Sequence, residues 1–303
     1  MRWFERPFPG SDRDQHWYML RTEHQLEQFT EQRAESQARA FLEDRIPKRI
    51  DPGSVKALCV EDHFHVGTRY KDVPNCIHRF RSLEYLRIPT RYVPHLREDS
   101  IPSSVRVLET IGDCPATFPE GISLPNVVRL EAPTAPLKFT AVTFPNLRHL
   151  ELRFDGKRSM FPVLRDLSRL HSLSIGPNRD PEIFEAVGAK ALAVLNLAGG
   201  AIDSLAGIER LRSLSAVGLR SLDKLKDISA LPKLPKLKDV MITWCGKLSA
   251  FDPLLRLAAL KYLDIFGCKS FRLDKYQAAL AGRNLRKLSL PPENWLRRAS
   301  RRR

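Results

Sequence analysis

The stretch that decides the fold is residues 192–265, in which one short pattern occurs four times. Residues 192–197 read LAVLNL, residues 214–219 read LSAVGL, residues 237–242 read LKDVMI and residues 260–265 read LKYLDI. Each copy has an apolar residue, two variable residues, a second apolar residue, one variable residue and a third apolar residue. The copies begin 22, 23 and 23 residues apart. A fixed spacing of this length indicates stacked structural repeats.

The same pattern continues in both directions, with eleven copies between residues 55 and 290. Two copies are degenerate, because Thr110 and Ala132 stand in the third apolar place. The apolar triplet places its side chains on one face of a strand, and a unit of about 22 residues cannot bury that face alone. The units must therefore stack. The copies begin at Val55, Leu83, Val105, Val127, Leu147, Leu170, Leu192, Leu214, Leu237, Leu260 and Leu285.

This pattern resembles the leucine-rich repeat, over residues 55–290. The resemblance implies an α/β fold: a right-handed leucine-rich-repeat solenoid with about eleven short parallel strands on its concave face. Family members such as ribonuclease inhibitor and the internalins bind protein partners on that face. The resemblance therefore implies a binding scaffold.

The family also expects Asn or Cys eight positions after the first Leu, where the side chain bonds backbone groups of the turn. This ladder position holds Asp113, Asp155, Asn178, Cys245 and Cys268, but Arg91, Ala135, Gly200 and Leu222 depart from it. We expect a patchy ladder in which Cys245 and Cys268 are buried and structural, not catalytic or metal-binding.

The segments that connect the strands differ along the chain. Residues 118–126 (FPEGISLPN) and 139–146 (FTAVTFPN) carry prolines and are predicted to be extended. Short α-helices or 3₁₀ turns are predicted for residues 181–191, 205–213, 251–259 and 274–284.

Three regions follow from these patterns. Residues 1–50 are predicted to form an N-terminal arm and a helical cap, since Thr22 to Gln25 fits a capping box before a run of helix formers. Residues 51–290 form the repeat solenoid, which needs such a cap over its end. Residues 291–303 form a basic tail with five arginines.

Composition narrows the class of protein. The 303 residues include 50 Lys+Arg and 35 Asp+Glu, a net charge of +15, with 43% hydrophobic residues, which is typical of a folded soluble protein. No run of about 18 apolar residues could cross a membrane, and the charged N-terminus does not fit a signal peptide. Five widely spaced cysteines fit a reducing compartment. We expect a cytoplasmic protein without a membrane partner.

No motif for catalysis or for a cofactor occurs in the sequence, so we predict neither an enzyme nor a cofactor. One group, His63, His65, Cys76 and His78, has residue types that bind zinc. Its spacing matches no zinc module, and loop histidines are common, so we predict no metal site. Metal analysis of the purified protein would decide between the two interpretations.

Alternate strand residues face away from the triplet and form the exposed sheet. An early zone on it is charged, and from this zone we predict these partner-binding residues: Tyr85, Arg87, Arg129, Arg148, His149 and Arg153. The other interpretation is that its arginines and its glutamates, such as Glu109 and Glu151, pair laterally between strands. A late zone mixes charge with bulky apolar residues, as interface hot spots do. Its predicted partner-binding residues are Lys238, Met241, Trp244, Lys261, Tyr262, Asp264 and Phe266.

The sequence therefore predicts a non-enzymatic module that binds a protein partner on its concave sheet. Because the chain is basic, an acidic partner fits best. An inhibitor or a toxin-immunity protein is a specific version of this role. One alternative is nucleic-acid binding through the basic surface and the arginine tail, and another is a substrate adaptor of a ubiquitin ligase.

Overall fold

A computed structural model describes residues 51–60, 75–153, 160–177, 180–187 and 191–290, except positions 54, 133 and 181. These residues form two compact units, and the boundary lies between Arg153 and Phe154. The predicted arm and cap, the basic tail, and the ladder positions Asp155 and Asn178 lie outside the described residues.

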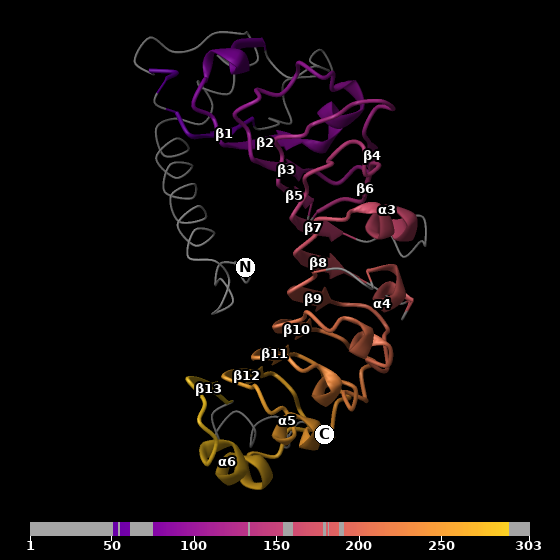
Figure 1. Ribbon diagram of the computed structural model, residues 1–303, viewed down its shortest axis with the longest axis vertical. Coiled ribbons are helices and arrows are strands. Elements are labelled where there is room, and N and C mark those ends of the chain that lie inside the picture. The colour runs from indigo at the N-terminus through magenta and orange to yellow at the C-terminus, as the bar shows by residue number, and fades with distance from the viewer. Residues whose placement is uncertain are drawn as a thin grey trace. The chain divides into compact units, whose positions relative to one another are not determined.

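The first unit contains five parallel strands that pair in chain order (Figure 1). They are β1 (Ala57–Cys59), β2 (Tyr85–Pro89), β3 (Val107–Ile111), β5 (Arg129–Ala132) and β7 (His149–Arg153). A separate parallel pair joins β4 (Ala116–Thr117) to β6 (Leu137–Lys138). Two 3₁₀ helices, η1 (Asn75–Arg79) and η2 (Thr90–His95), complete the described part of this unit.

The second unit contains six parallel strands, also paired in chain order. They are β8 (Ser172–Gly176), β9 (Val194–Ala198), β10 (Ala216–Arg220), β11 (Asp239–Thr243), β12 (Tyr262–Phe266) and β13 (Lys287–Ser289). Short helices lie in the connections: α3 (Phe161–Asp166), α4 (Ile183–Ala186), η4 (Ile208–Arg210), η5 (Leu231–Lys233), α5 (Asp252–Leu255) and α6 (Leu273–Ala281). Figure 1 shows α3 and α4 on one side of the neighbouring strands.

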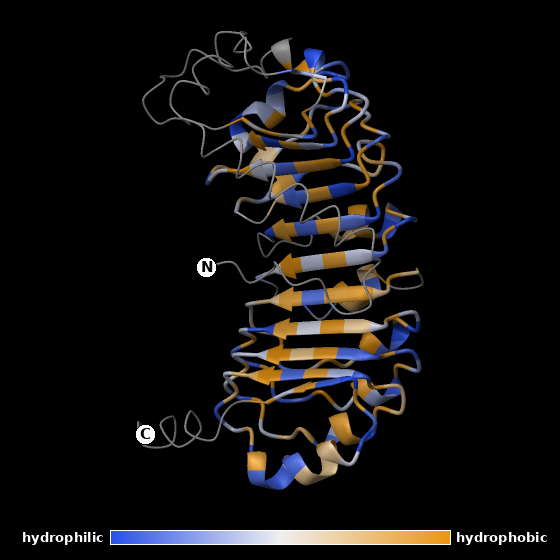
Figure 2. Ribbon diagram, turned by 90° about the vertical axis from the view of Figure 1, so that its left-hand side faces the viewer, coloured by the Kyte–Doolittle hydropathy of each residue, from blue (hydrophilic) through white to orange (hydrophobic). Residues whose placement is uncertain are grey.

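The predicted triplets form the core. Across the second unit, Leu173, Leu195, Val217, Val240 and Leu263 are aligned from strand to strand, and all five are buried. In the first unit, the degenerate residues Thr110 and Ala132 are also fully buried, so the weak copies keep the register. Figure 2 shows the resulting alternation of hydrophobic and hydrophilic residues along the strands. The predicted parallel-strand fold is thus confirmed.

The connecting segments differ between the units as predicted. The proline-bearing segments at 118–126 and 139–146 contain no helix, and Phe118, Phe139 and Phe144 meet edge to face with centroids 5.1–6.4 Å apart. The four predicted helical segments contain α4, η4, α5 and α6. Both kinds of connection bury large aromatic rings, since Phe184 of α4 and Tyr276 of α6 are also buried.

The ladder of turn-bonding side chains is patchy, as expected. Cys245 and Cys268 are buried, and their thiols donate to the carbonyl oxygens of Leu219 (3.8 Å) and Ile242 (3.7 Å) in the preceding coil. A hydrogen bond with Cys268 and burial raise the pKa of the Cys245 thiol, which keeps it protonated. The structural role predicted for both cysteines therefore fits their surroundings.

The first unit satisfies its turns differently. Asp113 occupies a ladder position but is exposed, and the next ladder position holds Ala135. Thr134, one residue earlier, accepts a hydrogen bond from the Gly112 backbone N–H at 3.1 Å. A neighbouring hydroxyl thus replaces the expected ladder side chain.

Substitution of Leu195 or Leu263 by Asp should unfold the second unit, because each side chain is buried within an aligned apolar column. An unpaired buried charge costs several kcal/mol. Ser249→Asp, at an exposed position, is the control. Thermal melting of the three variants checks this, and parent-like melting of both Leu variants would contradict the register.

Candidate functional site

The residues that alternate with the buried columns form the open face of each unit's sheet. The early zone lies on the open face of the first unit, on strands β2, β3, β5 and β7 and the residues just before them. The late zone lies on the open face of the second unit, on β11, β12 and their flanking residues.

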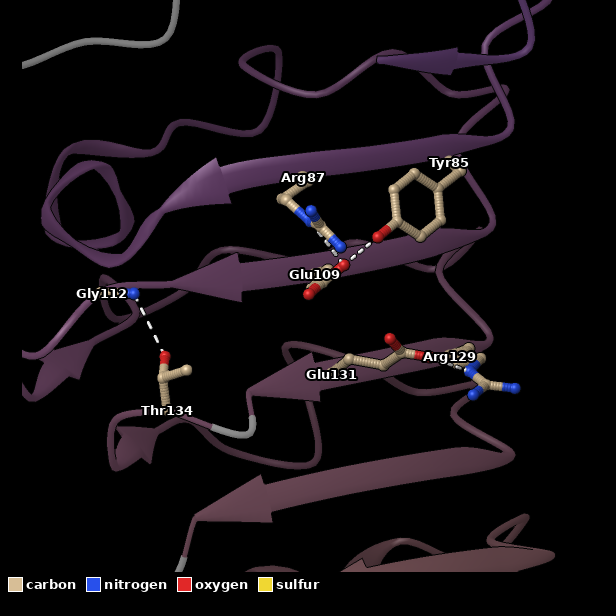
Figure 3. Close-up of polar contacts among 7 residues, drawn as sticks. All are labelled: Tyr85, Arg87, Glu109, Gly112, Arg129, Glu131 and Thr134. Carbon is tan, nitrogen blue, oxygen red and sulfur yellow. Dashed lines mark hydrogen bonds and ion pairs between the residues drawn. The ribbon is translucent and has the colours of Figure 1, made fainter. Parts of the chain in front are cut away.

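Glu109 is the centre of the early zone (Figure 3). The Tyr85 hydroxyl donates to Glu109 Oε2, and Arg87 Nε donates to the same oxygen at 2.7 Å. Tyr85 is only 6% exposed. The expectation that Tyr85 and Glu109 lie on an exposed surface is wrong, because the tyrosine ring and the carboxylate cover each other on neighbouring strands.

Three glutamates from consecutive strands are aligned in this zone. Glu109 is paired in register with Glu131, and Glu131 with Glu151. Arg129 forms an ion pair with Glu131 (Figure 3). Burial, together with the charges of Glu131 and Glu151, raises the pKa of Glu109 to about 9, although the charge of Arg129 opposes this. Burial and Glu131 raise the pKa of Glu151 to about 7.

The predicted binding residues of the early zone therefore divide into two groups. Arg87 and Arg129 are engaged in ion pairs within the sheet, and Tyr85 is buried. Arg148 and Arg153 are exposed, and His149 is half-buried. One ion pair, Arg87 with Glu109, joins two strands, and the other, Arg129 with Glu131, lies within β5. Of the predicted binding residues of this zone, only the exposed Arg148 and Arg153 are therefore fully open to a partner.

The glutamate column makes stability depend on pH. Glu109 and Glu151 bind their protons more tightly when folded, so their contribution to the free energy of unfolding is fully present below pH 4.5 and is lost as the pH rises through their folded pKa values of about 9 and about 7. It should fall by more than about 1 kcal/mol between pH 5 and pH 8. Glu109→Gln can still accept the Tyr85 hydrogen bond but cannot titrate. Urea unfolding at several pH values should therefore show a much smaller fall in the free energy of unfolding for this variant.

The control for that measurement is Glu120→Gln, at an exposed position of the same unit. It should retain the pH dependence of the parent. An identical pH dependence in the Glu109→Gln and parent proteins would mean that Glu109 is already ionised in the folded state at neutral pH.

The late zone brings its predicted residues onto two neighbouring strands. In register, Asp239 faces Tyr262, Met241 faces Asp264, and Thr243 faces Phe266. Tyr262 and Phe266 are four residues apart on β12, about 13 Å along the strand. They therefore lie at opposite ends of it, with Met241 and Asp264 between them. The large side chains Met241, Tyr262, Asp264 and Phe266 are half-buried.

Trp244 is the most exposed aromatic residue in the described part of the chain, at 42%. Its indole is therefore not buried beneath the turn beside Cys245. Its ring packs edge to face on Phe266, with centroids 5.2 Å apart, and its backbone N–H donates to the Phe266 carbonyl at 2.9 Å. Gly267 makes this possible, because a Cβ there would come within 2.6 Å of the indole.

Cations lie at the beginning of the late strands. The backbone N–H of Lys261 donates to the Lys238 carbonyl, and that of Arg286 donates to the Lys261 carbonyl, at 2.8 and 2.7 Å. Lys238, Lys261 and Arg286 thus occupy equivalent places on adjacent coils. Lys287, the next residue after Arg286, is paired in register with Tyr262. We call these four residues the basic rim.

Asp239 alternates with the apolar residues of β11 that face the core, yet it does not lie on an exposed surface. It is 4% exposed, and its Oδ1 has no hydrogen-bond partner among the described residues. Burial raises the pKa of Asp239 to about 6, although the charge of Lys238 opposes this. Its carboxylate is therefore less available to a partner than the basic rim.

Sequence reasoning did not single out Gly267, which supports the indole, or the vertical alignment of the three glutamates. The signal for the first was a glycine directly before a ladder cysteine. The signal for the second was Glu at the fifth place of three successive copies, at 109, 131 and 151.

Two other predicted features are only partly described. Of the group His63, His65, Cys76 and His78, the structure describes only the side chain of His78, which is exposed. Within the described ranges, no three His, Cys, Asp or Glu side chains gather as metal ligands. None of the helices in these ranges is long and apolar enough to cross a membrane.

Parallel strands spaced by one repeat, buried triplets and cysteines that bond the preceding coil decide the architecture. The chain has the leucine-rich-repeat fold. No family model matches this leucine-rich-repeat sequence, and no curated protein matches it.

Solved structures with similar folds are leucine-rich-repeat proteins of bacteria. An internalin (inlF) from Listeria monocytogenes shares 16% identity over 84% of this chain and 74% of its own, with a TM-score of 0.41. A leucine-rich-repeat protein of Leptospira interrogans shares 18% identity over 80% of this chain and 67% of its own, with a TM-score of 0.48. InlP of Listeria monocytogenes shares 13% identity over 71% of this chain and 61% of its own, with a TM-score of 0.47. At identities and TM-scores this low, the similarity to these structures does not indicate a function.

Proposed function

We propose that this leucine-rich-repeat chain is a non-enzymatic binding module that holds a protein partner on the open face of its second unit. The observation that carries the proposal is the exposed Trp244, held against Phe266 and over Gly267. The partner would contact this aromatic corner, the Met241 and Asp264 centre, and Tyr262.

An indole ring exposed to water, such as that of Trp244, costs free energy that a partner can recover by covering it. Among the described residues, only Val142 and Trp244 are large hydrophobic residues classed as exposed. Burying a side chain of this size is worth about 1.5–3 kcal/mol. Trp244 has positive φ (59°), and its ring rests on a glycine, so the backbone is shaped to hold the indole in place. A rigid aromatic side chain loses little conformational entropy when a partner covers it.

The charge around the patch favours an acidic partner. The basic rim supplies four cations beside Tyr262, whereas Asp239 is buried and Asp264 is half-buried. Complementary charge around an apolar centre steers association and selects the partner. An inhibitor or toxin-immunity role in the cytoplasm is the specific form of this proposal. The adaptor alternative depends on residues 1–50, which lie outside the described residues.

Trp244→Ala and the double variant Tyr262→Ala/Phe266→Ala should each weaken binding by about 1–3 kcal/mol per anchor residue. The reason is the loss of apolar area that the partner covers. Affinity capture with parent and variant baits would identify the protein retained only by the parent. Calorimetry on that purified protein then measures the loss.

Val142→Ala is the matched control, because Val142 is 64% exposed but lies in the first unit. It should bind like the parent. Equal affinity of the captured protein for the parent and the double variant would refute the proposed patch. A large fall in the melting temperature of the double variant would show that these rings serve folding instead.

Charge reversal at Lys238 or Lys261 should slow association and leave dissociation nearly unchanged, since rim charges act during encounter. Added salt should reduce the difference from the parent, because the Debye length shortens from about 10 Å at 0.1 M to about 3 Å at 1 M. Stopped-flow association at several salt concentrations measures both effects. A difference that persists at 1 M salt would argue against a steering role.

A further inference from the structure

The net charge of the chain is confined to its last third. Residues 1–209 contain 28 Lys+Arg and 28 Asp+Glu, whereas residues 210–303 contain 22 and seven, so all of the +15 lies there. Within the described residues 210–290, there are 17 Lys+Arg and six Asp, with no Glu. The excess is +11 in this segment, because 17 minus six is 11.

Part of this charge has partners within the unit. Arg272 pairs with Asp274 at 2.8 Å and Lys275 with Asp252 at 2.9 Å. Asp227 accepts hydrogen bonds from the Ser229 backbone N–H (2.8 Å) and the Ser204 hydroxyl (3.1 Å). Few carboxylates are therefore left for the remaining lysines.

Four exposed lysines lie in the segments that follow β10, β11 and β12. Backbone hydrogen bonds join these segments from coil to coil: Ser221 N–H donates to Thr243 O at 2.8 Å, and Trp244 N–H to Phe266 O at 2.9 Å. Lys224 and Lys247 occupy the same place in successive repeats, ten residues after the first Leu. We call the set the lysine row: Lys224, Lys226, Lys247 and Lys269.

Two of the other lysines in the row repel Lys247. The charges of Lys224 and Lys226 and a side-chain contact with Lys224 lower the pKa of Lys247. Asp223 raises it, but no ion pair involves any member of the lysine row within the described ranges. Like charges on adjacent coils oppose folding, so the fold itself gives no reason for the row.

We propose that the lysine row binds a polyanion with closely spaced phosphate groups. Adjacent coils lie about 4.8 Å apart, so a matching ligand needs negative charges spaced by about 4.8 Å or less. One nucleic-acid strand carries a phosphate about every 3.4 Å of helix axis. An extended acidic peptide carries same-face side chains only about every 6.7 Å, since alternate residues point away. Lysine binds phosphate as a compact point charge.

The lysine row is distinct from the basic rim, although it follows the same strands as the Trp244 and Phe266 corner of the proposed function. The basic rim precedes the late strands, whereas the lysine row follows them, at the opposite strand ends. The two rows also provide a matched pair of variants. Lys224→Gln/Lys247→Gln/Lys269→Gln and Lys238→Gln/Lys261→Gln/Arg286→Gln each remove three positive charges from three coils of the same unit.

The test measures binding of the full chain to a fluorescent 20-nucleotide oligo-dT and to inorganic polyphosphate, at several salt concentrations. The lysine-row variant should bind at least about tenfold more weakly at 0.1 M salt. The slope of log K against log salt for oligo-dT should fall by about 2, which corresponds to three lost contacts at about 0.7 each. The rim variant should stay within about threefold of the parent. If the parent binds oligo-dT more tightly than polyphosphate, nucleic acid is the source of the phosphates. If it binds polyphosphate more tightly than oligo-dT, the ligand is a phosphate polymer.

Three outcomes would overturn the proposal. Equal losses in the two variants would mean that only net charge matters, and an unchanged lysine-row variant would assign any binding to other residues. Tighter binding of poly-glutamate than of either phosphate polymer would assign the row to an acidic protein. The single variant Lys247→Gln, compared with Lys247→Arg, guards against misfolding, because only the Gln variant should weaken binding.

Discussion

No repeat of this chain can bury its own apolar strand face, and the rest of the structure depends on that constraint. Each triplet must be covered by the triplets of adjacent coils, as in the column from Leu173 through Leu195 and Val217 to Leu263. Stacking in register then forces equivalent residues of successive repeats into rows. The core, the cysteine bonds between coils and the charged rows of the surface all follow from this single alignment.

The same alignment has opposite consequences for charge in the two units. In the first unit it places the buried Glu109 and the half-buried Glu131 and Glu151 in one column, where Arg87 and Arg129 compensate part of the charge. In the second unit it places exposed lysines in rows with few carboxylates. A buried row of like charges shifts its protonation, whereas an exposed row keeps its charge and attracts ions of opposite sign. The first arrangement makes folding depend on pH, and the second provides surfaces for binding.

Much of the fold could be predicted from the sequence, because periodicity reports which side chains must be buried. The strands were predicted in this way, the short late helices from the composition of the connecting segments, and the buried cysteines from the resemblance to the leucine-rich repeat. The exposure of particular surface residues was not, as Tyr85 and Asp239 illustrate. Both alternate correctly with the core, but their burial depends on the size and contacts of neighbouring side chains one strand away. Trp244 shows the same limit, since its exposure depends on Phe266 and Gly267 in the next coil.

The sequence by itself determined the repeat register, and with it the parallel strands, the core and the rows of equivalent residues. Only the tertiary structure decided how each row is used. It separated Tyr262 from the Trp244 and Phe266 corner, engaged Arg87 and Arg129 within the sheet, and divided the described repeats into two compact units. The physical reason is that periodicity is a property of one strand, whereas burial, ion pairing and exposure are properties of neighbours that only stacking brings together.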